Sequence, residues 1–249
     1  PGDSQKRSER PGQTGGVVAY TADTSDLTSE QIAIKQQAHR FAAEVLRPAG
    51  IELDALSADE AIAPGSRLWG VFAKAYQAGY HTRGLPPQFG GAELGPLESH
   101  LIGEEFGWGS AGLAIALGAA SMPFMFAAMS GNPDLIRDIG VPFAEDREGK
   151  YIGCWPGTEP DHGSDTIYAT GDHARPDIHM NCIARKDGDE WVINGQKSAW
   201  VSNGTIATHA LLWVCVHPER GMSGNAFIIV PLNLPGVSRG KPTNKTGQR

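Results

Sequence analysis

The chain has 249 residues, an apolar fraction of 40% and a formal net charge of −7. This length suits one large domain or two of ordinary size. The acidic balance argues against general binding to nucleic acid or to anionic membranes. The three cysteines, Cys154, Cys182 and Cys215, are scattered and include no Cys-x-x-Cys pair. We therefore expect a cytoplasmic protein without structural disulfides, and the scattered histidines predict no metal site.

The first 25 residues are rich in Pro, Gly, Ser, Thr and charged side chains. This composition predicts a flexible tail, and it has no basic-then-apolar secretory pattern. Residues 111–129 carry no charge and are formally long enough to span a bilayer. Because a proline interrupts a helical ladder, two buried helices separated near Met122 and Pro123 explain this run better, and we expect no membrane span.

Residues 26–150 are predicted to form a helical domain. Thr28 and Gln31 match a capping box, with Leu27 and Ile32 as a hydrophobic staple. Apolar residues then recur at helical spacing, and Pro48 is expected to end this helix. Further helices are expected over 66–78, 96–107 and 132–140, and the segment 84–91 (Gly-Leu-Pro-Pro-Gln-Phe-Gly-Gly) predicts a loop.

Residues 151–249 have the pattern of a β domain. Short stretches rich in β-branched and aromatic residues, separated by Gly, Asp and Pro, begin at Asn181, Glu190, Ala210 and Ala226. Asp187-Gly-Asp predicts a hairpin turn. Helices followed by strands indicate an α+β chain with a mainly antiparallel sheet. The absence of a Gly-x-Gly-x-x-Gly motif argues against a doubly wound dinucleotide fold.

Two segments of the β domain have the residue types that a flavin requires. The first, 155–165, reads Trp-Pro-Gly-Thr-Glu-Pro-Asp-His-Gly-Ser-Asp, and the second is Trp200-Val-Ser. Glycine lets backbone amides approach a ring closely. Thr158 and Ser202 offer hydroxyls, and Trp200 offers a stacking face. Taken alone, the same residues could equally form an ordinary loop and a buried tryptophan.

In combination and order, these segments resemble the flavin-binding signature of the acyl-CoA dehydrogenase family. Other fragments agree with the resemblance: the loop 84–91, the acidic pair Glu104 and Glu105, the segment 235–238 (Pro-Gly-Val-Ser) and the segment 245–249 (Lys-Thr-Gly-Gln-Arg). The resemblance covers nearly the whole chain from Leu27. It implies an N-terminal helical domain and a middle β domain. The C-terminal four-helix bundle of the family is not in this chain, so the β domain is expected to be incomplete.

The resemblance implies FAD as the cofactor and assigns a role to each matching residue. Trp155, Pro156, Gly157 and Thr158 would line the isoalloxazine, although Pro156 removes one backbone N–H that relatives offer. Ser164 would contact both the cofactor region and the acyl-CoA thioester arm. Trp200 and Val201 would pack beside the flavin, and Ser202 would hydrogen-bond near its N5.

The family reaction is FAD-dependent α,β-dehydrogenation of an acyl-CoA thioester, an oxidoreductase step of fatty acid or acyl-CoA metabolism. A carboxylate base takes the α-proton while the β-hydrogen leaves as hydride to the flavin, and an electron-transfer flavoprotein or similar acceptor then takes the electrons. The base lies in the C-terminal bundle, so no residue here is assigned to it and we expect this fragment to be inactive alone. Two alternatives stay open: a non-catalytic or partner-dependent subunit of a homo- or hetero-oligomer, and a flavin monooxygenase-like relative of the same fold.

Four further features have plain structural explanations. Glu159 is expected to be structural and His162 exposed. Glu104 and Glu105 fit a helix face or a buried hydrogen-bonding pair. The basic residues near the end of the chain fit a solvated loop better than a phosphate site, and they are Arg239, Lys241, Lys245 and Arg249.

Overall fold

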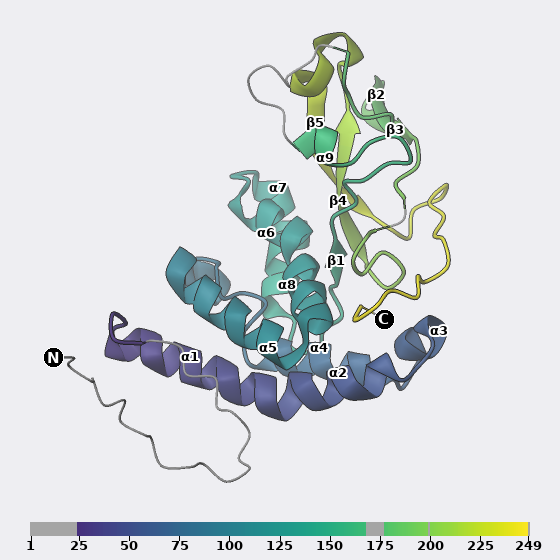
Figure 1. The fold of residues 1–249 in the computed structure, drawn as a ribbon. Helices are drawn as coiled ribbons and strands as arrows, with labels where there is room; N and C mark the ends of the chain where they lie inside the picture. Colours follow the sequence, from purple (N-terminus) through teal and green to yellow (C-terminus); the bar gives the residue numbers. More distant parts are fainter. Residues whose placement is uncertain (1–23, 168–176, 199, 249) are drawn as a thin grey trace, which may run out of the picture.

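The structure is a computed structural model that describes residues 24–167, 177–198 and 200–248. The predicted tail, residues 1–25, lies almost entirely outside the described residues. Figure 1 shows a layer of helices, purple to teal, with a smaller sheet domain above it in green and yellow. Helix α6 and strand β1 lie where the two parts meet.

The first helix, α1 (Ser29–Phe41), begins with the predicted capping box. The backbone N–H of Gln31 donates to the Thr28 hydroxyl over 3.2 Å, and the N–H of Thr28 donates to the Gln31 side-chain oxygen over 3.0 Å. Each bond satisfies a donor that a helix start leaves unpaired.

The prediction that Pro48 ends this helix is wrong. The chain passes through a π-helical turn, η1 (Ala42–Leu46), and continues as α2 (Arg47–Asp54) with Pro48 in its first turn. The N–H of Arg47 bonds back to the carbonyl of Ala42, which is the wide π spacing. A proline ring clashes with the fourth carbonyl before it in a regular helix, and the wider turn relieves this conflict. Pro142 has the same setting, because α8 (Val141–Glu145) follows the π turn η3 (Ile136–Gly140).

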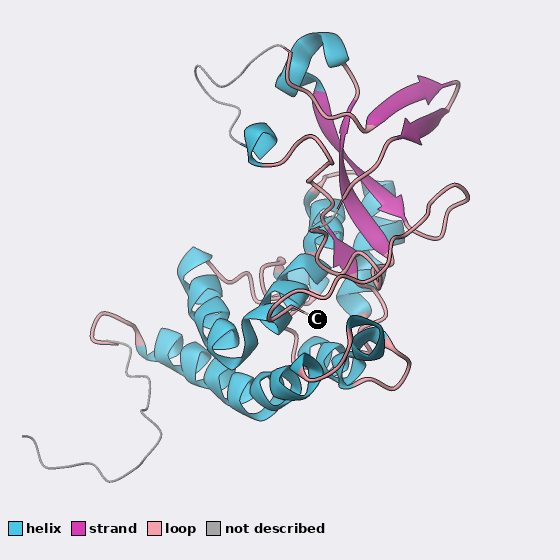
Figure 2. Cartoon of the chain, turned by 45° about the vertical axis from the view of Figure 1, so that its right-hand side comes forward, coloured by secondary structure: helices cyan, strands magenta, loops and turns pink. Residues whose placement is uncertain are grey.

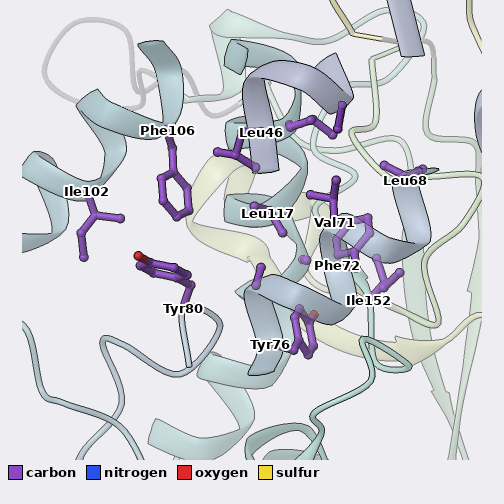
Figure 3. Close-up of a cluster of buried hydrophobic side chains, with 14 of the residues drawn as sticks. Leu46, Leu68, Val71, Phe72, Tyr76, Tyr80, Ile102, Phe106, Leu117 and Ile152 are labelled. Atoms are coloured by element: carbon purple, nitrogen blue, oxygen red, sulfur yellow. The ribbon is translucent and has the colours of Figure 1, made fainter. Parts of the chain in front are cut away.

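The helical core forms where α1, α2, α4 (Arg67–Gln77) and α5 (Pro96–Ala120) meet. Figure 3 shows its large apolar side chains, among them Leu46, Phe72, Tyr76 and Phe106, converging from separate helices. The short helix α3 (Ala58–Ile62) and the turn η2 (Pro87–Phe89) complete this side of the molecule. Such a core buries a continuous apolar stripe from each helix, which is the main source of helix stability in a folded domain.

The helix predicted over 96–107 is confirmed. The stretch α5 that contains it reaches Ala120 but is broken at Ser110, where φ is −165° and ψ is 112°, so the part after the break is the first helix of the apolar run. The predicted interruption near Pro123 is confirmed, because α6 (Met122–Met129) starts after Ser121, followed by α7 (Pro133–Leu135). By length and composition, Pro96–Met129 is the stretch among the described residues that could cross a membrane. Core helices pass the same test, and this stretch contributes Ile102, Phe106, Leu117 and Phe124 to the core. The absence of a membrane span stays a prediction.

The sheet domain contains a five-stranded sheet in which β4 is central. Strand β4 (His209–Cys215) pairs parallel with β1 (Gly153–Cys154) and β2 (Ile183–Asp187), and antiparallel with β5 (Asn225–Pro231). Strand β3 (Glu190–Asn194) forms the predicted hairpin with β2. The two long ladders, β2–β3 and β4–β5, are antiparallel as expected, and the sheet is mixed because β4 also makes short parallel pairings with β1 and β2. Long connections between β1 and β4 and between β2 and β4 let the chain return in the same direction for these pairings.

Two short helical segments, α9 (Ser164–Ile167) and η5 (Pro218–Gly224), lie on the sheet domain's connections. No four-helix bundle follows the sheet within the described part of the chain.

The junction between the two parts is tightly built. Asp146 accepts hydrogen bonds from the backbone N–H groups of Glu148, Gly149 and Tyr151, over 2.8 to 3.1 Å. The hydroxyl of Tyr76 on α4 donates to the carbonyl of Tyr151 over 2.6 Å. These bonds fix the path of the chain as it leaves the helices and enters β1.

Candidate functional site

A cavity of about 1130 Å³ opens between the helices α2, α3 and α5 and the sheet domain. In Figure 2 the loops that follow β3 and β5 lie close above the helices on this side. Its lining joins segments far apart in the sequence: the turn at Ser110, Pro156, residues 193–198, residues 200–206 and the segment 234–248. The volume is in the range of sites for large ligands.

Basic side chains predominate among the charged groups of the cavity. Lys197, Arg239, Lys241 and Lys245 line it, against one acidic residue, Asp54, among the described residues. Arg239 is held by the carbonyls of Thr205 and Ala207, over 2.9 and 2.7 Å. Lys197 is paired with Glu159, so in a chain of net charge −7 the wall formed by Arg239, Lys241 and Lys245 is the part of the cavity suited to phosphate groups.

The segment 155–158 passes through the sheet domain as an irregular strand. The carbonyl of Gly157 accepts a bond from Lys197 Nζ over 3.3 Å, and the carbonyl of Thr158 accepts from the N–H of Ser198 over 3.0 Å. Within the described residues, the backbone N–H and the hydroxyl of Thr158 have no hydrogen-bond partner. The segment thus has its carbonyls engaged on the strand side and a donor pair left for a ligand.

Glu159 is buried beneath this segment and pairs with Lys197. Lys197 Nζ lies 2.7 Å from Glu159 Oε1, and the two side chains are 7% and 0% exposed. The same carboxylate accepts from the backbone N–H groups of Asn181 and Cys182, over 2.6 and 2.9 Å. Its setting is that of a structural group, because every contact fixes protein backbone or the lysine.

The second predicted segment, residues 200–202, borders the cavity. The Trp200 side chain is 60% exposed, and Lys245 Nζ lies 5.2 Å from the centre of its ring. Asn203 follows in the left-handed conformation, with φ of 63°, which asparagine adopts more readily than most residues. Its side-chain amide donates to the carbonyls of Ala116 and Gly153, over 2.8 and 3.1 Å. Asn203 thereby ties this segment to both α5 and β1.

The structure brings together part of the predicted set of site residues. Pro156, Trp200, Val201 and Ser202 line the cavity. Trp155, Gly157, Thr158 and Ser164 lie outside its lining. Trp155 is 37% exposed, and a Cβ added at Gly157 would lie 3.9 Å from an atom of the Trp155 ring and 3.9 Å from an atom of the Trp213 ring. The role of each residue in binding stays a prediction.

Ser164 is exposed and is the first residue of α9. Nearby, His162 Nδ1 lies 2.8 Å from Asp165 Oδ2, and the backbone N–H of Gly163 donates to Asp165 Oδ1 over 2.6 Å. The His162 side chain is only 19% exposed, so it is more buried than the sequence predicted. Its partner, Asp165, also holds the turn at Gly163.

The acidic pair on α5 belongs to an ionic cluster in which Glu105 and Lys35 are buried and Glu104 is partly exposed. Lys35 Nζ lies 2.6 Å from carboxylate oxygens of both Glu104 and Glu105, and His39 Nδ1 lies 2.7 Å from the second oxygen of Glu105. No group of three or more His, Cys, Asp or Glu suited to a metal occurs within 24–167, 177–198 and 200–248. The three cysteines are free and buried, and burial raises the pKa of Cys154 to about 12.

Two residues of the site escaped the sequence reasoning. Neither Lys197 nor Asn203 was assigned a role from the sequence. The available signals were a lysine in an otherwise apolar and glycine-rich segment, and an asparagine directly before Gly204, a pair typical of turns.

Comparison with known proteins identifies both parts of the chain. Residues 28–143 match the model for the acyl-CoA dehydrogenase N-terminal domain, and residues 154–249 match that for the middle domain. Cyclohex-1-ene-1-carbonyl-CoA dehydrogenase of Geobacter metallireducens is 30% identical over 90% of this chain and 53% of its own length. The mitochondrial short-chain specific acyl-CoA dehydrogenase of Rattus norvegicus is 27% identical over 90% of this chain and 49% of its own.

Solved structures agree with the sequence relatives. A structure described as PigA with FAD and proline has a TM-score of 0.66 at 28% identity, over 85% of this chain and 50% of that one. Glutaryl-CoA dehydrogenase from Mycobacterium smegmatis has a TM-score of 0.67 at 22% identity, over 86% and 48%. The chain thus spans about half the length of the relatives it matches. With both domain models matched in order and the same fold observed, this chain belongs to the acyl-CoA dehydrogenase family.

Proposed function

We propose that this chain carries part of the FAD site of an oxidoreductase that dehydrogenates an acyl-CoA thioester. The observation that carries the proposal is the cavity at which Pro156, Trp200 and Ser202 converge. The relatives support it, because they are named as acyl-CoA dehydrogenases and one neighbour is described with FAD.

The residues present fit a flavin. A flavin requires hydrogen bonds along its polar edge, a partner near N5 and an apolar surface over part of the ring. The free N–H and hydroxyl of Thr158 supply donors. The Ser202 hydroxyl, also without a partner among the described residues, supplies another. Trp200 exposes its indole face, and the basic wall near Lys241 suits phosphates.

When bound, FAD supplies the acceptor for the hydride that leaves the substrate. The protein's own contribution is to hold the ring edge by Thr158 and Ser202, to cover one face with Trp200, and to keep the surrounding cavity partly closed to water. Ser164, exposed at the start of α9, is proposed to contact the thioester arm. No residue of this chain is proposed as the base.

The partners and location are proposals of the same kind. An electron-transfer flavoprotein or similar acceptor would take the electrons, and a homo- or hetero-oligomer would complete the site. The buried free cysteines support a reducing compartment such as the cytoplasm. Two measurements distinguish a partner-dependent subunit from an enzyme that is complete in one chain: the intact mass of the purified native protein and the identity of the subunits that copurify with it.

The proposed cofactor is tested by exchanging Trp200 for alanine in the full-length protein. Because the exposed indole face is lost, the variant should retain less FAD after gel filtration, with a dissociation constant raised about tenfold. Phe227→Ala is the matched control: Phe227 is 43% exposed on β5 and lies outside the cavity lining, so its removal should leave FAD retention unchanged. Folded wild-type protein without affinity for FAD would refute the proposal.

A further inference from the structure

The segment 155–158 has no regular strand to hold its conformation. Within the described residues, β1 ends at Cys154 and no ladder bond follows until β2. The carbonyls of its last two residues, Gly157 and Thr158, are held instead by Lys197 and Ser198, which follow β3. Its shape therefore depends on where the segment after β3 is fixed.

Lys197 and Glu159 supply that fixed point. The lysine Nζ has three contacts: Glu159 Oε1 at 2.7 Å, the Gly157 carbonyl at 3.3 Å and the Met180 sulfur at 3.6 Å. Through Glu159, the same unit holds the N–H groups at the start of β2. One buried ion pair thus joins the ends of β1, β2 and β3.

The orientation of the Gly157 carbonyl determines the direction in which the backbone N–H of Thr158 points. The peptide between Gly157 and Thr158 is planar, so its N–H points away from its carbonyl. Because Lys197 holds the carbonyl on the strand side, the N–H of Thr158 is turned to the other side, where it has no partner among the described residues. Gly157 itself has no Cβ to restrict rotation, and Pro156 offers no N–H of its own.

We propose that the Lys197–Glu159 pair is a positioning device that sets the Thr158 N–H and hydroxyl toward the flavin. The proposal rests on the FAD site proposed above. Although Lys197 lines the cavity, its ammonium is taken up by Glu159 and by the Gly157 carbonyl, so in this proposal it acts through that carbonyl, and Glu159 acts by holding Lys197. The two therefore govern how tightly the polar edge of the ring is bound and how it is polarised.

The test compares Lys197→Met with Lys35→Met in the full-length protein. Both variants break a buried ion pair, but Lys35 binds Glu104 and Glu105 in the helical domain, far from the segment 155–158. We expect Lys197→Met to raise the dissociation constant for FAD at least tenfold and to shift the visible absorption of the bound flavin. Lys35→Met should lower the melting temperature and leave both flavin measurements unchanged. All titrations are made well below the lowest melting temperature.

Glu159→Gln is the second variant, useful if Lys197→Met does not fold. The amide oxygen keeps one acceptor for the backbone but no longer neutralises Lys197, so a smaller weakening in the same direction is expected. The proposal is overturned if either folded variant binds FAD with wild-type affinity and spectrum, or if Lys35→Met weakens binding equally. If the wild-type protein does not bind FAD, the proposed FAD site itself is refuted. This outcome differs from failure of the positioning proposal, in which the wild type and the variants bind FAD equally well.

Discussion

At the scale of single residues, the buried polar groups divide into those that hold the fold and those that face the cavity. His81 belongs to the first kind: its ring stacks on Tyr76 with centroids 4.2 Å apart and lies against Phe143. Burial, reinforced by the nearby Arg147 guanidinium, lowers the pKa of His81 from 6.5 to about 4. The imidazole is therefore neutral in the folded protein over a range where it is charged in the unfolded chain.

This shift predicts a loss of stability in acid. Because the unfolded chain takes up a proton at His81 below about pH 6.5 and the folded protein does not until about pH 4, the free energy of unfolding falls across this window. The loss should be on the order of 2–3 kcal/mol. Urea unfolding at a series of pH values measures it.

Two variants assign the effect to this ring. His81→Phe keeps an aromatic ring against Tyr76 and should flatten the dependence between pH 6.5 and 4. His100→Phe alters an exposed histidine on α5 and should leave the dependence as in the wild type. An unchanged slope in His81→Phe would show that other groups are responsible.

At the scale of elements, the sequence predicts most clearly where one local rule applies. The capping box at Thr28, the break before Pro123 and the hairpin around Gly188 each depend on a few adjacent residues, and the structure confirms them. The prediction that the helix ends at Pro48 was wrong because the preceding turn is widened to a π turn, which a rule based on adjacent residues does not anticipate. The break at Ser110 has no proline to mark it.

The pairing of strands follows from contacts across the molecule. Parallel pairing of β1 with β4 joins residues 153–154 to 209–210, and no local pattern in either strand encodes it. For the same reason, only part of the site could be predicted from the sequence. The motifs identified Trp200 and Ser202, but only the fold reveals that Lys197 contacts the Gly157 carbonyl and that Asn203 donates to the Ala116 carbonyl.

One close approach between elements gives a sharp prediction. A Cβ added at Gly153 on β1 would lie 2.4 Å from Pro123 Cδ and 2.6 Å from the carbonyl of Ala120. Because both neighbours are held in or beside α6, they have little room to yield. Gly153→Ala should therefore lower the free energy of unfolding by about 1–3 kcal/mol, the usual cost of overpacking.

Gly107→Ala is the matched control for this prediction. Gly107 is exposed within α5, and nothing lies within 4 Å of an added Cβ. Since alanine is the better helix former, the control should raise stability by about 0.5–1 kcal/mol. Chemical unfolding of both variants gives the two changes, and a neutral Gly153→Ala would show that β1 and α6 are not tightly packed.

At the scale of the whole molecule, the site depends on how the sheet domain is seated on the helices. The cavity has walls from both, so the position of β1 relative to α5 fixes its width. Asn203 ties β1 to α5 through the carbonyls of Gly153 and Ala116, and the turn at Asp146 fixes the residues that lead into β1. The cavity is therefore a property of the assembled chain rather than of either domain.

Asp146→Ala tests this dependence. The substitution removes an acceptor for three backbone N–H groups in a turn where the carboxylate is buried, and each such bond contributes about 1 kcal/mol. We expect a loss of about 2–3 kcal/mol in the free energy of unfolding. Hydrogen exchange should also become faster at Ile152 and Cys154, while the amides of α1 keep their protection.

Asp138→Ala is the control, because Asp138 is exposed and pairs with Arg137 on the surface. Removing an exposed ion pair should leave the free energy of unfolding almost unchanged and should not alter exchange in β1. If Asp146→Ala instead lowers protection equally in α1 and β1, the turn stabilises the molecule as a whole and does not specifically seat the sheet. If exchange becomes faster in β1 alone, the turn at Asp146 specifically holds β1, the strand that joins the sheet domain to the helices.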